Sequence, residues 1–254
     1  MIPSATWTPT RPDRAEPTFS EQAYLRLRAD IISGATAPGE KLKIEVLQQR
    51  YQLSNTPLRE ALNRLAGEKL VVADERRGFR AAPVSEEDFN DLTDYRLVLE
   101  HGALVAAIEH GTDEWEGAVL SAFHQLENST SRLDAEGEQS EMAALKTSEW
   151  RDRHKAFHMA LISGCRSKRL MAVCSDVFDQ AERYRNLASK TDTNTRHSGQ
   201  EHRQIVDAVL ERDAPLATAL MRNHVRKSTI HILAMLREQM TAAVKPPRAT
   251  RRNA

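Results

Sequence analysis

The chain of 254 residues is poor in cysteine, aromatic residues and glycine. Its two cysteines, Cys165 and Cys174, are too widely spaced for a C-x-x-C redox or zinc pair, so we expect both to be reduced thiols of a protein core. Aromatic residues form 5% of the chain, and it has 10 glycines, which argues against a β-sandwich or a β-barrel. These absences favour a mostly helical protein.

The sequence also lacks an apolar run of membrane-spanning length and an apolar N-terminal signal segment. We therefore expect a cytoplasmic protein that has no membrane partner. Residues 1–17 include four prolines and predict a disordered leader, and residues 241–254 predict a basic disordered tail. The length between these segments suits two domains, each with its own core.

Enzyme motifs are missing as well. A zinc protease of the H-E-x-x-H type needs glutamate after its first histidine, but residues 154–158 read HKAFH. The chain has no G-x-S-x-G nucleophile elbow and no phosphate-binding glycine loop. We therefore expect no enzymatic activity. The remote alternative is a metal-dependent helical-bundle enzyme, but the Glu-x-x-His pairs of di-iron bundles are missing.

The charge of the chain is balanced overall but unevenly distributed. Lys plus Arg and Asp plus Glu both total 36, and residues 1–84 hold 13 basic and 10 acidic residues. That segment therefore carries a charge of +3, and the remainder carries −3. The asymmetry is modest, so it supports nucleic-acid binding only together with a motif.

Such a motif occurs at residues 53–65, LSNTPLREALNRL. Residues 54–56 are all N-cap types, and the following Pro57 is tolerated only in the first turn of a helix. Three leucines then recur at helical spacing, which leaves Thr56 and Arg59 on the opposite face. The pattern predicts a helix that is anchored on one face and free to enter a DNA groove with the other.

The neighbouring segments complete a winged helix-turn-helix domain over residues 18–84. A capping box at Thr18 and Glu21 predicts a first helix, and residues 44–51 predict a short second helix. The second and third helices, joined by a tight turn, form a helix-turn-helix. Residues 71–81 then read as two short strands around the polar turn DERRG, which predicts a small β-wing with a basic tip.

The run from IISGATAPGEKL through NTPLREALNRLAGEKLV to RRG resembles the winged-helix domain of the GntR family of bacterial transcription regulators. In that family an arginine at the position of Arg59 contacts DNA, and a glycine at the wing tip, here Gly78, approaches the minor groove. Many members have arginine where this chain has Asn55, which can read adenine instead of guanine. The predicted DNA site comprises Asn55, Thr56, Arg59, Arg76, Arg77 and Gly78. The alternatives are a solvated surface arginine at 59 and, for the two wing arginines, a charged turn rather than phosphate contacts.

From residue 85 onward helical patterns dominate the sequence. They predict helices over residues 85–108, 113–128, 141–163, 168–188, 196–211 and 214–240. Helices of this number and spacing predict an all-α bundle of six or seven helices over residues 85–240. We expect this domain to bind an effector and to form a dimer.

The histidines are the second informative feature. All nine lie at position 101 or later, and four occupy apolar helix faces, namely His154, His158, His202 and His224. Buried imidazoles need partners, and a divalent metal supplies one for all four. An i,i+4 pair with two histidines from neighbouring helices is standard chelation geometry. The carboxylate of Glu201 can orient one of these histidines by a hydrogen bond. The alternative is that each histidine is satisfied separately in the core.

The segments AFHMALISG, EHRQIVDAVLERD and RNHV resemble the FCD effector domain of the FadR branch of the GntR family. Metal-binding members carry Asp-x3-His on one helix and one histidine on each of two later helices. The resemblance therefore implies ligands at His158, His202 and His224, with His154 in place of the aspartate. It implies a divalent metal, zinc first, with nickel, manganese or iron as alternatives.

The same resemblance implies an organic-acid effector. Residues 96–127 are similar to regulators of the carbon-starvation group, which respond to glutarate-type dicarboxylates. Arg96 can grip a second carboxylate bidentately beside Glu100, and the alternative is a structural pair between the two. Arg183 and Arg185 are weaker candidates, because the run AERYR is equally typical of a solvated helix face.

These features together predict a ligand-responsive repressor that binds a pseudo-palindromic operator as a homodimer. Ligand binding is expected to rotate the helical domain about a linker near residues 81–85. Two alternatives remain for the input signal. One is a regulator that responds to the metal itself, and the other is a regulator with an acyl ligand in a metal-free pocket.

Overall fold

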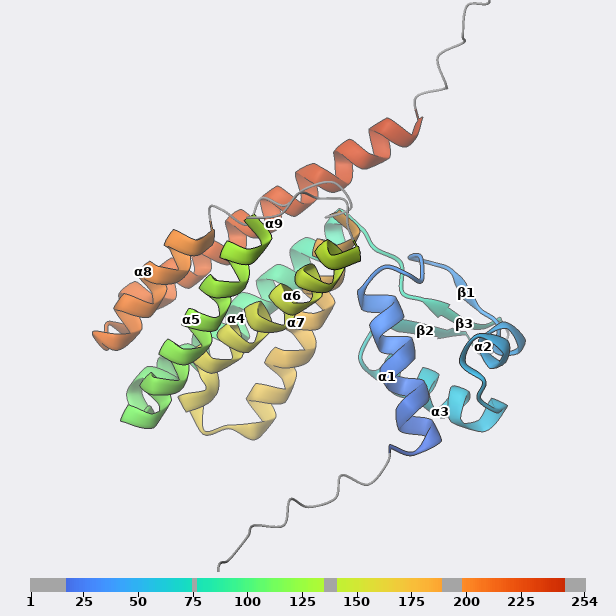
Figure 1. Cartoon of the computed structure of the whole chain (residues 1–254), viewed down its shortest axis with the longest axis horizontal. Helices are drawn as coiled ribbons and strands as arrows, with labels where there is room; N and C mark the ends of the chain where they lie inside the picture. Colours follow the sequence, from blue (N-terminus) through green and yellow to red (C-terminus); the bar gives the residue numbers. More distant parts are fainter. Residues whose placement is uncertain (1–16, 75–76, 135–140, 189–197, 245–254) are drawn as a thin grey trace, which may run out of the picture.

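A computed structural model describes residues 17–74, 77–134, 141–188 and 198–244. They form a winged domain and a helical domain, and α1 lies on the side of the winged domain that faces the helical domain (Figure 1). The winged domain consists of α1 (Phe19–Ile32), β1 (Lys41–Leu42), α2 (Ile44–Tyr51), α3 (Asn55–Gly67), β2 (Val71–Asp74) and β3 (Gly78–Ala81). Residues 1–16 of the predicted leader, residues 245–254 of the predicted tail and Arg76 lie outside the described residues.

Local signals in the sequence explain where the helices of the winged domain begin. The hydroxyl of Thr18 accepts a hydrogen bond from the backbone N–H of Glu21 at 3.2 Å, which is one half of the predicted capping box. Helix α3 begins after Ser54, whose backbone is extended, and Pro57 lies in its first turn. The predicted first and third helices are thus confirmed, and α2 occupies the residues predicted for the second helix.

Three leucines anchor α3 in the core of the winged domain. Leu58, Leu62 and Leu65 are completely buried and pack with residues of α1 and α2 such as Leu27 and Leu47. Burial of a leucine side chain stabilises a fold by roughly 1.5–3 kcal/mol. The opposite face of α3 is consequently held at a fixed orientation toward solvent.

The wing is a three-stranded antiparallel sheet with the order β1-β3-β2. Val71 pairs with Ala81 and Asp74 with Gly78, which has a φ of +81° that suits glycine. The sequence predicted β2 and β3 but not β1, which pairs Leu42 with Phe79. In β2, Val71 is buried, whereas Val72 is 46% exposed.

The helical domain contains α4 (Glu86–His110), α5 (Asp113–Asp134), α6 (Glu141–Ile162), the 3-10 helix η1 (Ser163–Cys165), α7 (Lys168–Ala188), α8 (Ser198–Leu210) and α9 (Ala214–Val244). The all-α bundle that was predicted is confirmed. Two of the predicted ends were wrong, because α5 continues to Asp134 instead of ending at residue 128, and α9 continues to Val244 instead of ending at residue 240. The long helix α9 crosses the bundle and extends beyond it (Figure 1).

Aromatic and aliphatic side chains fill the centre of the bundle. Phe123 and Phe157 are buried against each other with ring centroids 5.7 Å apart, and Cys165 and Cys174 are free, buried thiols as expected. A second cluster, in which Phe89 stacks on Tyr184, fills the end of the bundle nearest the winged domain. Among the described residues, no helix is both long and apolar enough to cross a membrane.

Candidate DNA interface, metal centre and effector pocket

The start of α3 presents polar side chains to solvent. Asn55, Thr56 and Arg59 are all exposed. Arg59 donates from Nε to Oδ1 of Asn55, one helical turn earlier, at 2.8 Å. The guanidinium and the amide therefore form one hydrogen-bonding surface, with further donors and acceptors available to the edges of bases.

The wing places a basic residue and a glycine beside each other. The Arg77 side chain is 76% exposed, and Oδ2 of Asp74 lies 3.8 Å from its Nε. Gly78 follows with its positive φ and has open space where a side chain would stand. Both residues are accessible to a phosphate backbone, so the geometry is compatible with the predicted wing contacts.

Four buried histidines from three helices meet in the middle of the bundle. His154 and His158 come from α6, His202 from α8 and His224 from α9, and each residue is at most 5% exposed. Nε2 of His154 lies 3.2 Å from Nε2 of His158, and the Nε2 atoms of His202 and His224 are also 3.2 Å apart. One potential ligand atom from each histidine lies within 4.8 Å of the others.

Burial keeps these imidazoles neutral. It lowers the pKa of His154, His158 and His202 well below the usual value, and it also lowers the pKa of His224. Neighbouring charges act in the same direction, from Arg96 on His158 and from Arg185 on His154. Neutral imidazole is the form that binds a metal, so protons compete little for these nitrogens at neutral pH.

The donor set fits a divalent transition metal. A zinc–nitrogen bond is about 2.0–2.1 Å long, so two nitrogens on one ion are at most roughly 4.2 Å apart. The largest separation here, within 4.8 Å, requires only small side-chain adjustments for all four histidines to reach one ion. A set of four imidazoles suits zinc, nickel, copper or iron.

A carboxylate hydrogen-bonds to His224, one of the four candidate metal ligands. Nδ1 of His224 lies 2.8 Å from Oε2 of Glu201, and this hydrogen bond lowers the pKa of Glu201 to about 2. With its Nδ1 proton donated to Glu201, His224 keeps the Nε2 lone pair free for a metal. Nδ1 of His154 and Nδ1 of His158 have no hydrogen-bond partner among the described residues, so these two ligands are less firmly oriented.

Arg96 and Glu100 form a buried ion pair on α4. Nε of Arg96 donates to Oε1 of Glu100 at 2.6 Å, and both side chains are less than 10% exposed. The guanidinium also stacks over the ring of Phe178 at 4.8 Å. Oε2 of Glu100 has no hydrogen-bond partner among the described residues. Arg96 and Glu100 therefore form a buried ion pair, in contrast to the weak, exposed pair that was the alternative from the sequence.

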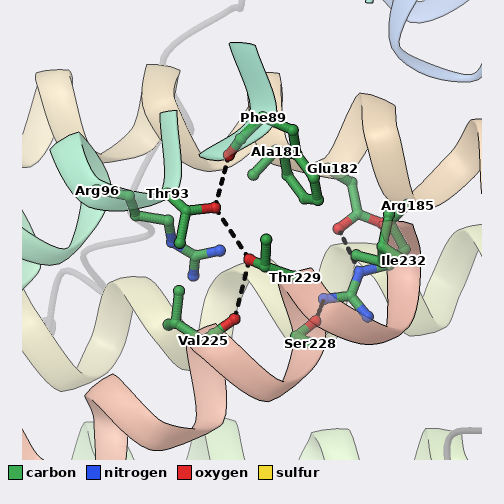
Figure 2. Close-up of a pocket in the computed structure, with 10 residues that line it drawn as sticks. All are labelled: Phe89, Thr93, Arg96, Ala181, Glu182, Arg185, Val225, Ser228, Thr229 and Ile232. Atoms are coloured by element: carbon green, nitrogen blue, oxygen red, sulfur yellow. Dashed lines mark hydrogen bonds and ion pairs between the residues drawn. The ribbon is translucent and has the colours of Figure 1, made fainter. Parts of the chain in front are cut away.

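A small polar pocket lies beside Arg96. Figure 2 shows Arg96 and Arg185 on either side of a hydrogen bond of 2.9 Å between the hydroxyls of Thr93 and Thr229. Arg185 donates to Oε2 of Glu182 at 3.2 Å and to Ser228 at 2.9 Å. The free space is about 10 Å³, which holds about one water molecule.

The description of AERYR as a solvated helix face is wrong. Arg183 is 3% exposed and donates to the backbone oxygen of Ala82 at 2.5 Å, in the linker between the domains. The Arg185 side chain is 23% exposed and lines the pocket. Both guanidiniums are held by acceptors on other elements, so their charge can be accommodated inside the protein.

Two family models together match most of the chain. The model described as the FCD domain matches residues 91–227, and the model described as bacterial regulatory proteins, gntR family, matches residues 19–80. The chain belongs to the GntR family. It is a transcription regulator with a GntR DNA-binding domain followed by an FCD effector domain.

Curated relatives agree over nearly the whole length. The GntR protein is 38% identical to the HTH-type transcriptional repressor GlaR of Escherichia coli over 212 residues, which are 81% of this chain and 92% of GlaR. It is 37% identical to the HTH-type transcriptional regulator BphR of Paraburkholderia xenovorans over 208 residues, 82% of each chain. Both relatives are named as regulators rather than enzymes.

Solved structures share the fold. E. coli McbR/YncC superposes with a TM-score of 0.70 at 15% identity, covering 87% of this chain and 99% of the other. A putative GntR regulator from Rhodococcus sp. RHA1 gives a TM-score of 0.64 at 20% identity, covering 85% and 97%. At this level of identity the likeness concerns the arrangement of the two domains.

Sequence reasoning missed part of the pocket of this GntR regulator. Thr93, Ser228 and Thr229 supply hydroxyls to its wall, and Glu182 holds Arg185. The hydroxyl residues lie at inward positions of α4 and α9 that a hydrophobicity pattern treats as interruptions. A polar residue that recurs at core spacing is the signal that could have identified them.

Proposed function

We propose that this GntR regulator is a repressor that binds a pseudo-palindromic operator as a homodimer and releases it when a small organic acid binds at a metal in the FCD domain. The observation that carries this proposal is the cluster of His154, His158, His202 and His224 beside a pocket with two arginines. A glutarate-type dicarboxylate is the favoured effector. Repression is supported by the name of GlaR, a transcriptional repressor.

The charges around the pocket support a dicarboxylate. A divalent ion held by four neutral histidines keeps its full charge of +2, because no ligand in the set is anionic. Arg96 and Arg185 add two guanidiniums that line the adjacent space. One carboxylate of the effector would bind the ion, and the second would accept paired hydrogen bonds from an arginine.

The exposed start of α3 supports DNA reading by Asn55, Thr56 and Arg59. The accessible Arg77 and Gly78 support phosphate contacts by the wing, and the sequence assigns Arg76 the same role. One recognition helix reads only a few base pairs, so a homodimer on two half-sites gives adequate specificity. Apolar side chains on the surface of α4 and α9 support a dimer. Tyr95 is 51% exposed, Val98 72% and Ile230 69%, and surfaces of this kind mark protein contacts.

Thermal shift and operator binding measured together test this function. The protein is compared as loaded with zinc and after chelation, each with a panel of dicarboxylates and acyl compounds. The proposal predicts that zinc raises the melting temperature and that glutarate raises it further only when zinc is present. Operator release by glutarate is expected to need zinc as well.

Other outcomes identify the alternatives. Operator release on adding or removing zinc, without an acid, favours a sensor of the metal itself. Stabilisation by an acyl compound in the chelated protein favours a metal-free pocket. If chelation changes neither the melting temperature nor the response to acids, the histidine site is not a metal site. His202→Ala is expected to lower the zinc content while operator binding in the absence of effector persists.

A further inference from the structure

The contact between the two domains is concentrated on α7. Three polar residues on one face of this helix, Asp179, Arg183 and Asn186, reach the winged domain or its linker. Nδ2 of Asn186 donates to the backbone oxygen of Ile32 at 2.8 Å, at the end of α1. The turn after α1 also fits closely, because a Cβ at Gly34 would lie 3.1 Å from the side chain of Leu187.

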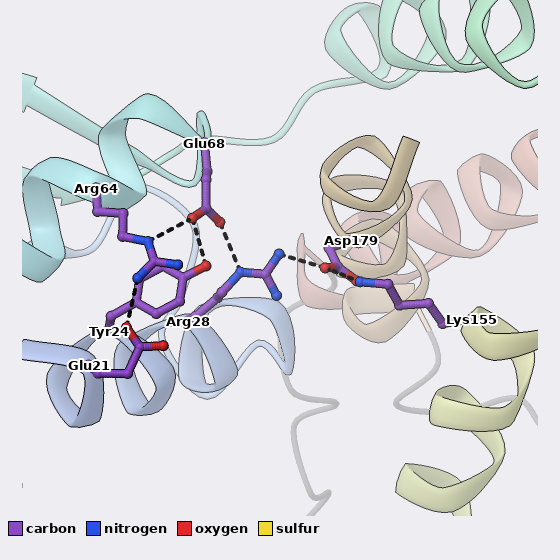
Figure 3. Close-up of polar contacts among 7 residues, drawn as sticks. All are labelled: Glu21, Tyr24, Arg28, Arg64, Glu68, Lys155 and Asp179. Atoms are coloured by element: carbon purple, nitrogen blue, oxygen red, sulfur yellow. Dashed lines mark hydrogen bonds and ion pairs between the residues drawn. The ribbon is translucent and has the colours of Figure 1, made fainter. Parts of the chain in front are cut away.

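Arg28 connects this face of α7 to α3, the helix proposed to read DNA. Its Nη2 donates to Oδ2 of Asp179 at 2.5 Å, and its Nε donates to Oε2 of Glu68 at 2.9 Å (Figure 3). Glu68 is the residue that caps the C-terminus of α3, and Tyr24 also donates to it at 2.7 Å. A continuous set of hydrogen bonds therefore runs from α7 through α1 to the end of α3.

Asp179 also contacts α6, the helix that carries the candidate metal ligands His154 and His158. Nζ of Lys155 lies 2.5 Å from Oδ2 of Asp179, and Lys155 follows the candidate ligand His154 on α6. Asp179 is 6% exposed, so its charge depends on these two cations. Removal of one partner from a buried ion pair is strongly destabilising, which makes the arrangement sensitive to small shifts of α7.

Glu182, one turn after Asp179, connects the effector pocket to this contact. Its Oε2 accepts the hydrogen bond from Arg185 inside the pocket. Its Oε1 is buried without a hydrogen-bond partner among the described residues, and the nearest cation on that side is Arg151 of α6, with Nε 3.9 Å away. The cleft between the domains is lined by both Arg151 and Glu182, together with Arg28 and Asp179. Glu182 therefore lies between the effector pocket and the domain contact.

The pocket is too small for an organic acid as it stands, because its free space of about 10 Å³ is that of a single water molecule. A dicarboxylate can enter only if lining side chains move. Arg185 is suited to move, because a ligand carboxylate offers it the same interaction that Glu182 offers now. That exchange removes the hydrogen-bonded cation from Glu182, which is 7% exposed.

We propose that α7 transmits the effector signal through an exchange of ion-pair partners. The effector takes Arg185 from Glu182, and Glu182 then turns to Arg151. The resulting shift of α7 loosens the contact of Asp179 with Arg28. This inference rests on the proposed function for the effector, but the contact itself exists without a ligand. The present arrangement, with the contact formed, corresponds to the DNA-binding state. Loss of the contact frees the winged domain and lowers operator affinity.

The contact can be tested without any effector. Asp179→Asn in the full-length, zinc-loaded protein is expected to weaken operator binding about ten-fold, as coupling between domains typically does. Glu127→Gln is the matched control, because Glu127 pairs with Arg203 at 2.9 Å on the surface, away from the winged domain. Zinc content and the melting curve verify the fold. Asn186→Ala, which removes the bond to Ile32, is the second variant and should act in the same direction. Operator affinity equal to wild type in both variants overturns the proposal.

The exchange itself is tested with Glu182→Gln and glutarate as the probe. This variant is expected to bind glutarate at least as tightly as wild type in calorimetry, because no carboxylate competes for Arg185. Release of the operator by glutarate should be largely lost, since no buried charge needs a new partner. Normal release in this variant overturns the exchange. If wild type binds no glutarate at all, the proposed effector is wrong, and the Asp179 variant in ligand-free protein still decides the contact.

Discussion

Oε2 of Glu201 lies 2.8 Å from Nδ1 of His224, although Glu201 is the sequence neighbour of His202. The bond crosses from α8 to α9 and fixes which nitrogen of His224 carries the proton. Lys227 holds the other oxygen of the same carboxylate at 2.7 Å. Lys227 thus anchors one oxygen of Glu201, and the other oxygen orients His224, a candidate metal ligand.

This relationship predicts that Glu201→Gln lowers zinc affinity about 10- to 100-fold, the usual effect of removing the carboxylate behind a histidine ligand. Competition with a chromogenic chelator measures the affinity. Lys227→Gln is the control, because it leaves the bond from His224 to Glu201 intact and should change zinc affinity little. Equal losses in the two variants would contradict an orienting role for Glu201.

Arg59→Ala is expected to abolish specific operator binding, because a bidentate contact with a base discriminates by about 1–3 kcal/mol and the helix offers few other contacts. Fluorescence anisotropy with operator and scrambled DNA measures this loss. Arg203→Ala changes the net charge equally on a distant helix, and should leave the ratio of specific to non-specific binding unchanged. Dimerisation and zinc content should persist in both variants. Normal operator affinity of the Arg59 variant would refute its recognition role.

Val98→Asp is expected to convert the proposed dimer into monomers, because it introduces a charge into the exposed apolar surface of α4. Analytical ultracentrifugation measures the mass, and operator affinity should fall with it. Val173→Asp on α7 is the control, since Val173 is also partly exposed, at 38%, but lies outside that surface. A dimeric Val98 variant would place the interface elsewhere.

The buried histidines predict a specific dependence of stability on pH in the chelated protein. Their pKa values are lowered by burial in the folded state, but return to about 6.5 on unfolding. Below that pH the unfolded chain binds protons that the folded chain does not. The free energy of unfolding should therefore fall as pH decreases below about 6.5, by about 1.4 kcal/mol per pH unit for each such histidine.

Denaturant titrations at pH values from about 7.5 to about 5, a range that includes the pKa of histidine in the unfolded chain, measure this slope. His158→Gln removes one titrating group and should make the curve less steep. An identical slope in the variant would show that His158 does not stay neutral in the folded protein.

Local patterns predicted much of this structure because they arise from local causes. The leucines of α3 and the i,i+4 spacing of His154 and His158 depend on helix geometry alone, and both appear as expected. The prediction that three helices direct imidazoles to one interior point is also confirmed. Strand β1 was missed because two residues are too few to show a period.

Other features depend on partners that are distant in the sequence. Arg183 looked solvated because its acceptor, the backbone oxygen of Ala82, lies 101 residues away. Glu201 was expected to support the histidines without a defined partner, and the choice of His224 follows from the packing of α8 on α9. The burial of Arg96 and Glu100 likewise needs three-dimensional information, since the same i,i+4 pair is common on helix surfaces.

The closed state of the pocket between α4, α7 and α9 has a kinetic consequence. If the effector must wait for Arg185 to leave Glu182, the observed association rate levels off at the opening rate as ligand concentration rises, instead of increasing without limit. Each encounter with a closed pocket is unproductive, which also reduces the apparent affinity by the fraction of open molecules. The regulator would then respond little to short increases in the concentration of the acid, and fully to increases that last longer than the opening time of the pocket.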